Sequence, residues 1–164
     1  MDPRERTEKF GIDLAADPFV PNDFEVVEHI KGPLLEWNPH RPKIELVLMP
    51  GQRKGIMTGA KIQEDLKAFE GLPVNANALD YLLLRLKEAP WVIPHEWRSV
   101  EMHKSKHILF WGTLYKFDGS LCVRSLDWNQ DARDQVWRSG YCWVENHLNS
   151  QYPAAMVRIK AVSY

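Results

Sequence analysis

The pattern of HILFWGTLYKFDGSLCVRSLDW, residues 107–128, is typical of two strands joined by a tight turn, and this stretch is the most informative part of the sequence. In its first half, apolar residues alternate with period two and occupy both faces of the expected strand. Asp118-Gly119 follows, a dipeptide that tolerates the positive φ angles of a type I′ hairpin turn. We therefore predict an antiparallel hairpin with strands at about 107–117 and 121–128.

The residues after this hairpin extend the same sheet. Two further apolar runs, separated by polar and turn-forming residues, predict strands at about 136–144 and 155–162. The result is a four-stranded antiparallel meander. Four of the seven tryptophans of the chain belong to it: Trp111, Trp128, Trp137 and Trp143.

The N-terminal half supplies the remaining elements of the predicted domain. They are strands at about 25–30 and 43–49 and helices at about 59–69 and 77–88. Thr58 is placed to cap the first helix, and Asn75 or Asn77 to cap the second. The expected fold class is therefore α+β, with an antiparallel, Trp-rich C-terminal β-meander packed against one or two amphipathic helices.

Length and composition indicate one folded domain preceded by an arm. Of the 164 residues, 45% are hydrophobic and 26% are charged, which is ordinary globular usage. We expect residues 25–164 to form a single domain and residues 1–24 to form a partly ordered N-terminal arm. No apolar run approaches the roughly 20 residues needed to span a bilayer, and the N-terminus lacks the apolar core of a signal peptide. We therefore expect a cytoplasmic protein, without a membrane partner, whose two cysteines stay reduced.

The charge distribution gives only a weak indication of a nucleic-acid partner. The formal net charge is −1, with 12 basic against 16 acidic residues in 1–96 and 9 against 6 in 97–164. The C-terminal half is thus slightly basic. This asymmetry falls short of the basic patch that is typical of nucleic-acid-binding proteins.

A histidine-rich segment before the hairpin is a candidate metal site. His95, His103 and His107 lie within thirteen residues, with Glu96 and Glu101 between them. A zinc site needs three or four such ligands converging on one point, and the spacing of His103 and His107 would allow this only on a helix. Because a strand is predicted here, we favour exposed or packed histidines and predict no metal and no cofactor.

Three other patterns could support chemistry, and each has a simpler structural explanation. Cys122 or Cys142 could be a nucleophile near Arg124, but a small thiol inside an aromatic sheet is usually inert. The densest group of carboxylates comprises Asp127, Asp131 and Asp134. Acid–base catalysis needs carboxylates whose surroundings give them different pKa values, and the sequence offers no second cluster that would provide such a difference. Residues 51–55 (GQRKG) precede a helix as a phosphate-binding loop does, but the P-loop spacing is absent. We therefore predict no catalytic residue and favour a non-enzymatic role.

A series of short motifs runs through the middle of the chain. It comprises Asn75-Ala76-Asn77, Leu79-Asp80-Tyr81-Leu82-Leu83, Ile93-Pro94, Glu96-Trp97, Phe110-Trp111-Gly112-Thr113, Tyr115, Asp118-Gly119, Val123-Arg124, Trp128 and Pro153-Ala154-Ala155. This series resembles a group of small, uncharacterised bacterial proteins over roughly residues 44–155. The resemblance implies a bacterial, cytoplasmic origin and no particular chemistry. The chain differs from that group in its longer N-terminal arm and in an inserted segment at 99–106.

The tryptophans supply the leading functional hypothesis. Large rings commonly form the core of a small sheet, but some of them could instead form an exposed platform. We expect a non-enzymatic binding module whose aromatic sheet face contacts a protein partner or a second copy of the chain. The predicted binding residues are Trp111, Arg124, Trp128, Trp137, Arg138, Tyr141 and Trp143. One alternative is nucleic-acid binding through the same rings and Arg124, Arg138, Arg158 and Lys160; another is an enzyme with its site at residues 95–107 or around Cys122.

Overall fold

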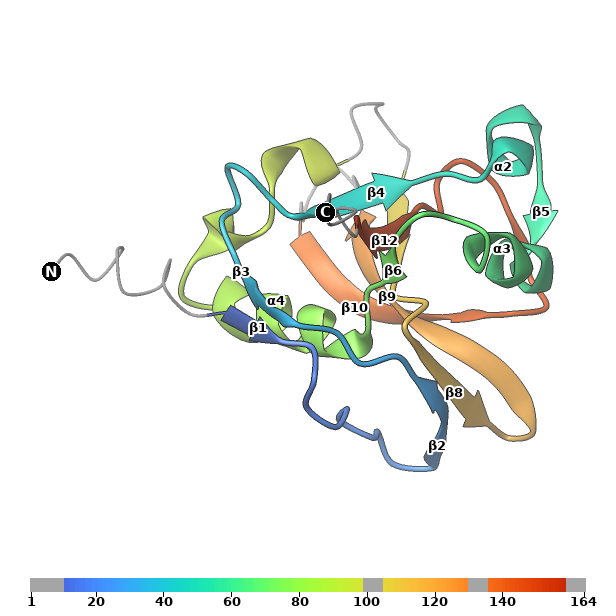
Figure 1. Cartoon of the computed structure of the whole chain (residues 1–164), viewed down its shortest axis with the longest axis horizontal. Helices are drawn as coiled ribbons and strands as arrows, with labels where there is room; N and C mark the ends of the chain where they lie inside the picture. The colour runs from blue at the N-terminus through green and yellow to red at the C-terminus, as the bar shows by residue number, and fades with distance from the viewer. Residues whose placement is uncertain (1–10, 99–104, 130–135, 159–164) are drawn as a thin grey trace, which may run out of the picture.

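The computed structural model describes residues 11–98, 105–129 and 136–158 as an α+β fold built on a curled, largely antiparallel sheet (Figure 1). The strands are β1 (Gly11–Asp13), β2 (Phe24–His29), β3 (Leu34–Glu36), β4 (Ile44–Val47), β5 (Met57–Thr58), β6 (Leu72–Pro73), β7 (Lys106–Leu109), β8 (Thr113–Phe117), β9 (Ser120–Asn129), β10 (Val136–Trp143), β11 (His147–Leu148) and β12 (Ala154–Val157). The helices are α2 (Pro50–Lys54), α3 (Gly59–Leu66) and α4 (Ala76–Leu86), followed by 3-10 turns at Pro90–Val92 and His95–Trp97. No helix in this described part has the length and apolar character needed to cross a membrane.

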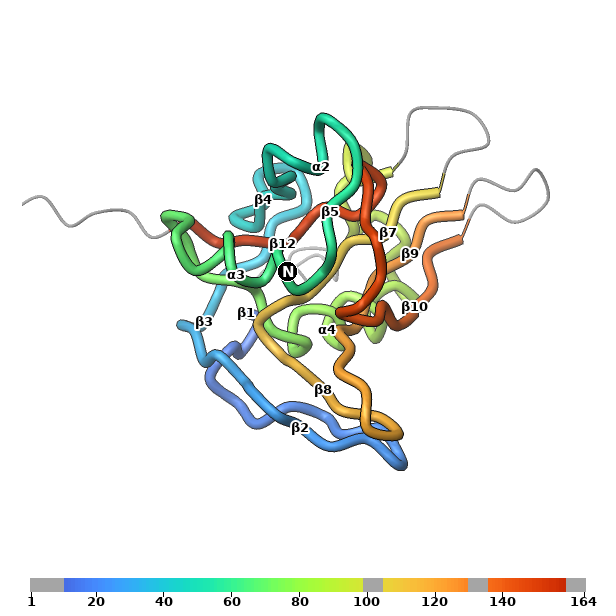
Figure 2. Tube along the Cα trace, turned by 90° about the vertical axis from the view of Figure 1, so that its right-hand side faces the viewer, coloured from blue at the N-terminus to red at the C-terminus, as the bar shows by residue number. Residues whose placement is uncertain are grey.

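The long strand β9 is the centre of the main sheet. One of its edges pairs with β10, and the other pairs first with β8 and then with β7 (Figure 2). The β8–β9 turn has positive φ angles at Asp118 (47°) and Gly119 (78°), so the predicted hairpin turn is confirmed. The sheet continues from β7 to β12 and β4, and from β8 to β2.

The single strand predicted at 107–117 is wrong, because the chain breaks between β7 and β8. At the break, the Gly112 N–H donates to the Val74 carbonyl (3.0 Å), and the Gly112 carbonyl accepts from the Ile30 N–H (2.7 Å). A Cβ on Gly112 would lie 2.5 Å from the Asn75 nitrogen, so only glycine fits against this backbone. A distant segment therefore interrupts a strand that the local pattern makes continuous.

The predicted fourth strand of the meander is present but lies elsewhere. β12 pairs in parallel with β7 and antiparallel with β4 and β6, rather than with β10. After β10 the chain crosses to β5, and the buried Gln52 amide then holds the next turn by donating to the carbonyls of Asn149 (3.1 Å) and Tyr152 (2.8 Å). The meander thus has three strands. The part of the predicted strand at 159–162 lies outside the described residues.

Two helices cover opposite faces of the sheet. Ile108 and Leu109 are neighbours in β7 and point to opposite sides. Ile108 belongs to the core cluster that contains the buried face of α4, and Leu109 to the cluster that contains α3. The predicted caps are confirmed: Thr58 Oγ1 accepts from the Lys61 N–H (3.2 Å), and Asn75 Oδ1 from the Asn77 N–H (3.1 Å).

The described part of the N-terminal arm is fixed to the domain. β1 pairs with β3, and Ile12 and Leu14 are fully buried in the α4 cluster. Asn75, at the start of α4, also binds the arm, because its Nδ2 donates to the Leu14 carbonyl (2.8 Å). The first half of the arm, residues 1–10, lies outside the described residues.

Candidate functional site

The tryptophans predicted to form a platform are mostly core residues. The exposed fraction is 6% for Trp111, 3% for Trp128 and 7% for Trp137, against 36% for Trp143. Trp128 and Trp137 are paired across β9 and β10 with their ring centroids 5.1 Å apart. An open platform made of all four rings therefore does not form, and only Trp143 retains substantial exposure.

Arg124 is a buried structural cation. Its side chain is 7% exposed, and its Nη1 donates to Asp80 Oδ1 on α4 at 2.8 Å. Burial by itself lowers the pKa of the guanidinium, but the Asp80 carboxylate more than offsets this and the pKa stands above its usual value. The ion pair ties α4 to β9. It leaves Arg124 unsuited to bind an external phosphate.

Four aromatic rings gather on one face of the sheet near the N-terminal end of α4. We call Phe24, Phe117, Tyr141 and Trp143 the aromatic cluster. Phe24 stacks on Phe117 (4.6 Å) and on Tyr141 (4.7 Å), and Phe117 contacts Trp143 (6.2 Å). Tyr141 is 45% exposed and Trp143 36%, so the cluster forms an aromatic surface that no described helix covers.

Sequence reasoning found two members of this cluster and missed the other two. Tyr141 and Trp143 come from β10, as predicted. Phe24 and Phe117 come from β2 and β8, which pair with Phe24 opposite Phe117. The period-two pattern placed each ring on a strand face, but only the pairing of β2 with β8 brings them beside β10.

β10 forms one edge of the sheet in the described part of the chain. It pairs with β9 over all eight of its residues, Val136 to Trp143, without a register shift, and with no other strand. Tyr141 and Trp143 share one face of this strand. Arg138 lies on the other face, opposite Asp127, so the structure does not place it beside the aromatic cluster.

The two cysteines are unsuited to nucleophilic chemistry. Both are free thiols in the core, with exposed fractions of 0% for Cys122 and 5% for Cys142. Burial raises the pKa of each thiol to about 11, so both are protonated at neutral pH. The alternative site around Cys122 therefore lacks an activated thiol.

The predicted histidine and aspartate groups are only partly within the described residues. His103, Asp131 and Asp134 lie outside them, and among the described residues no group of three or more potential ligands could hold a metal ion. His107 Nδ1 lies 2.9 Å from Asp127 Oδ1, and Nε2 lies 3.2 Å from Ser105 Oγ. The Tyr152 ring stacks on the imidazole at 4.7 Å, so this group joins β7, β9 and the turn before β12.

The candidate phosphate loop is a helix. Residues 50–54 form α2, whose Gln52 is buried and holds the turn before β12 as described above. The backbone N–H groups that a phosphate loop would present include Gln52 and Arg53, and both donate to the Met49 carbonyl (2.9 and 3.3 Å). The segment therefore stabilises the fold and does not present these N–H groups to an anion.

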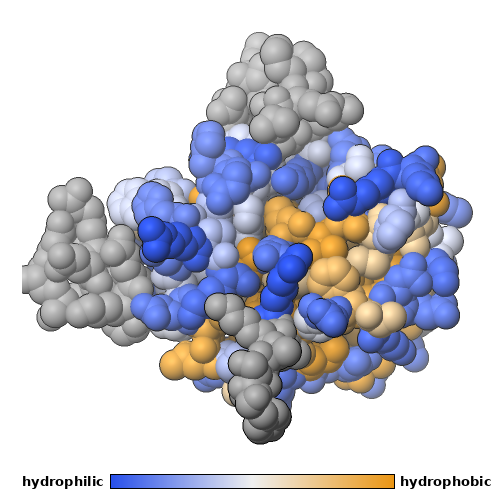
Figure 3. Space-filling view, turned by 45° about the horizontal axis from the view of Figure 1, so that its top comes forward, coloured by the Kyte–Doolittle hydropathy of each residue, from blue (hydrophilic) through white to orange (hydrophobic). Residues whose placement is uncertain are grey.

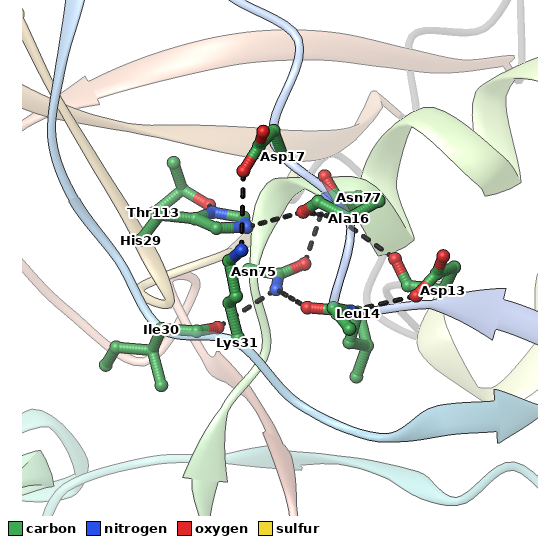
Figure 4. Close-up of polar contacts among 11 residues, drawn as sticks. Asp13, Leu14, Ala16, Asp17, His29, Ile30, Lys31, Asn75, Asn77 and Thr113 are labelled. Atoms are coloured by element: carbon green, nitrogen blue, oxygen red, sulfur yellow. Dashed lines mark hydrogen bonds and ion pairs between the residues drawn. The ribbon is translucent and has the colours of Figure 1, made fainter.

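A polar network missed by sequence reasoning joins the arm, β2 and α4 (Figure 4). His29 Nδ1 lies 3.0 Å from Thr113 Oγ1, and its Nε2 lies 2.9 Å from the Ala16 carbonyl, which can only accept. Nε2 of the imidazole therefore carries a proton and donates to this carbonyl, while Nδ1 and the Thr113 hydroxyl share the second hydrogen bond. Thr113 Oγ1 in turn accepts from the Ala76 N–H (2.9 Å). Because these groups satisfy one another, the network stabilises the fold and offers no open donor to a ligand.

A second apolar surface is visible in space-filling view. Apolar residues gather near the middle of the face that Figure 3 shows, where Figure 1 places β4 and β12. In these strands Leu46 and Val157 are half-buried against the α4 core cluster, and Val47 is half-buried against the α3 core cluster on the other face. This surface is the margin of the core, and the polar groups of Glu45 and Arg158 beside it form an ion pair with each other (2.7 Å), so we do not treat it as a site.

Comparison with known proteins assigns no function to this geometry. No family model matches the chain, and no curated protein or solved structure shows significant similarity to it. The β10 edge, the aromatic cluster and the cavities are the features of the structure that can indicate a function.

Proposed function

We propose that the chain is a non-enzymatic interaction module that forms a homodimer through the free edge of β10 and the aromatic cluster. The observation that carries this proposal is the state of β10. It is an edge strand of eight residues, VWRSGYCW, paired without a register shift, and it exposes Tyr141 and Trp143. Arg138 is its one charged residue and lies on the face opposite these rings. Edge strands of this length normally carry a bulge, several charges or a cover that prevents pairing with another chain, and among these β10 has only the single Arg138.

A second copy of the chain is the simplest partner for such an edge. Two β10 strands in antiparallel contact are related by a two-fold axis, so one self-complementary surface serves both subunits. Backbone N–H and C=O groups on both edges would pair, and the sheets would become continuous. Tyr141 and Trp143 of each subunit would then lie within the contact, in the C-terminal half of each β10 strand.

The expected affinity is moderate. Burying the exposed parts of Tyr141 and Trp143 in both subunits removes on the order of 400 Å² of aromatic surface, worth up to about 10 kcal/mol. Association itself costs an estimated 4–15 kcal/mol. The aromatic rings alone thus roughly balance that cost, and the added backbone pairing gives a dissociation constant on the order of 1–10 μM.

The test is the solution mass of the full chain as a function of concentration. Light scattering and sedimentation equilibrium from about 0.5 to 200 μM should follow a monomer–dimer equilibrium with a midpoint in the micromolar range. Hydrogen exchange then separates strand pairing from ring contact alone. The outward-facing amides of β10 should exchange quickly in dilute solution and slowly in concentrated solution. A single-chain mass at all concentrations, with no change in β10 exchange, would contradict the proposal.

A cytoplasmic location belongs to the same proposal. Two buried free thiols without a disulfide support a reducing compartment. The alternative of nucleic-acid binding has less support, because Arg124 is paired with Asp80 and Arg158 with Glu45 (2.7 Å). Three of the four tryptophans that would stack bases are buried.

A second candidate function comes from one geometric observation. The contacts from Ser105 Oγ to His107 Nε2 and from His107 Nδ1 to Asp127 have the atom order of a Ser-His-Asp triad. In that case Ser105 would be the nucleophile of an acyl-transfer enzyme. A fluorophosphonate probe should label the wild type at Ser105 and leave the Ser105→Ala and His107→Gln variants unlabelled. An unlabelled wild type would reject this candidate and leave the dimer proposal untouched.

A further inference from the structure

We propose that a cavity beside Trp111 binds a small zwitterion, specifically a free amino acid with an apolar side chain. The cavity has a volume of about 210 Å³ and lies between α3, the end of β2 and the break between β7 and β8. We call it the Trp111 cavity. It is separate from the β10 edge, so it can be tested independently of dimerisation.

Two irregularities of the sheet build this cavity. The first is the break at 110–112, which places Trp111 in the turn between β7 and β8. The second is a bulge in β2: Val26 pairs with Tyr115, but Glu28 rather than Val27 pairs with Leu114. The extra residue places Glu28 on the face of Leu114, a member of the α3 core cluster that also contains Trp111.

The polar groups around the Trp111 cavity have no partners among the described residues. Glu28 and Lys67 carry opposite charges and line the same cavity, yet neither makes an ion pair, and the Gln63 side chain makes no hydrogen bond. The indole N–H of Trp111, a side chain with 6% exposure, is buried and also lacks an acceptor. This contrasts with the network around Asn75, where every polar side chain is bonded. Unpaired polar groups among the residues that line a partly apolar cavity are typical of a ligand site.

The types of these groups select the ligand class. The Glu28 carboxylate suits an ammonium group, whereas the Lys67 ammonium and the Gln63 amide suit a carboxylate. Ile30, Leu66 and the Trp111 ring supply apolar walls between them. The volume corresponds to about seven liquid waters, which is room for a ligand of about ten non-hydrogen atoms. A leucine- or phenylalanine-sized amino acid meets all three requirements.

The first experiment is a titration of the full chain with L-phenylalanine and with L-leucine. Binding is monitored through the indole N–H signal of Trp111 in a nitrogen–proton NMR spectrum. The Trp111→Phe variant assigns that signal. We expect saturable shifts with a Kd of about 0.1–1 mM, the range for a ligand of this size. Phenethylamine lacks the carboxylate and 3-phenylpropionate lacks the ammonium, so each should bind about tenfold more weakly than L-phenylalanine.

Charge variants then assign each contact. Glu28→Gln should weaken the binding of L-phenylalanine about tenfold and leave the affinity for 3-phenylpropionate unchanged, because 3-phenylpropionate has no ammonium group. Lys67→Met should also weaken the binding of L-phenylalanine about tenfold but leave the affinity for phenethylamine unchanged, because phenethylamine has no carboxylate. Glu25→Gln and Lys54→Met alter exposed charges that do not line the cavity and should leave all affinities unchanged. Both test residues are exposed, so the variants should fold. The proposal is overturned if neither amino acid gives a saturable shift, or if both charge variants bind L-phenylalanine as the wild type does.

Discussion

β2 and β10 are the outer strands on either side of the β8–β9 hairpin, and they treat their free edges differently. β2 has a bulge at Val27 and carries two glutamates, Glu25 and Glu28. β10 runs without a bulge for eight residues, carries the single charge of Arg138 and exposes two aromatic rings. Bulges and charges are the usual means by which an edge avoids pairing with another chain. One edge of this sheet is therefore protected, and the other has the features of an interface.

The difference extends to what supports each strand. β10 lies on β9, which Arg124 and Asp80 fix to α4 within the largest buried cluster of the described residues. β2 pairs with β8 and is held at its end by the His29 network. An edge strand that is already held in place loses less conformational entropy on pairing than a mobile one would. The support of β10 is thus the first part of the comparison to test.

The largest expected effect comes from removing that support with Asp80→Ala. The variant leaves the Arg124 guanidinium buried without its carboxylate, and breaking such a pair costs about 2–4 kcal/mol after allowance for the partial exposure of Asp80. Urea unfolding in dilute solution measures the loss. The control is Glu45→Ala, which breaks the exposed ion pair with Arg158 and should cost less than about 1 kcal/mol. Equal costs in the two variants would mean that Arg124 does not fix β9 to α4.

The next effect is on association. Tyr141→Glu combined with Trp143→Glu gives β10 the acidic edge of β2, removes aromatic surface and places like charges across the two-fold axis. We expect the dimer dissociation constant to rise at least about 100-fold, which corresponds to about 2.7 kcal/mol. Sedimentation equilibrium measures it. Val27→Glu on the β2 edge, at a residue of 50% exposure, should leave the constant unchanged. If only Val27→Glu weakened the dimer, the interface would lie at the β2 edge rather than at β10.

The hairpin, the two main helices and their caps could be predicted from the sequence, because each depends on neighbouring residues. The Asp118-Gly119 turn and the Thr58 and Asn75 caps are local chemistry of this kind. The break at Gly112 could not be predicted, since it depends on Val74, nearly forty positions away in the sequence. Short strands such as β1 and β6, with three and two residues, are likewise defined by their partners.

The candidate sites show the same limit. Tyr141 and Trp143 could be predicted as strand aromatics, but their exposure could not be distinguished from the burial of Trp128 and Trp137, which share their face of β10 and β9. The difference is that α4 covers only part of that face. The sequence did not indicate that Glu28 and Lys67 line a cavity with Trp111, because their relation to Trp111 depends on the β2 bulge and the docking of α3.

A smaller effect concerns alkaline pH and again distinguishes the two edges, because Cys122 and Cys142 lie in β9 and β10 and β2 has none. Burial raises the pKa of each thiol from 9.0 to about 11, so the folded state favours the neutral form. The contribution of the neutral thiols to the free energy of unfolding is complete below pH 9 and is lost as pH rises toward 11. Between pH 8 and pH 10, each thiol should lower the free energy of unfolding by about 1 kcal/mol. Urea unfolding of Cys122→Ala at the two pH values should show a loss smaller by that amount than in the wild type; an identical loss would show that Cys122 titrates normally.

The smallest effect on stability, and the sharpest test of the comparison, is deletion of Val27. Because Val27 is the bulged residue, its removal straightens β2 while Glu28 stays opposite Leu114 and His29 opposite Thr113. We expect the free energy of unfolding to change by no more than about 1 kcal/mol, since the side chain is half exposed and makes no core contact. If the bulge protects the edge, the deletion combined with Glu25→Thr should add a second, weaker association step at high concentration, seen by light scattering as mass above the dimer. A mass that never exceeds the wild-type value would show that the bulge does not protect the β2 edge. The exposed rings of β10 would then be what distinguishes the two edges.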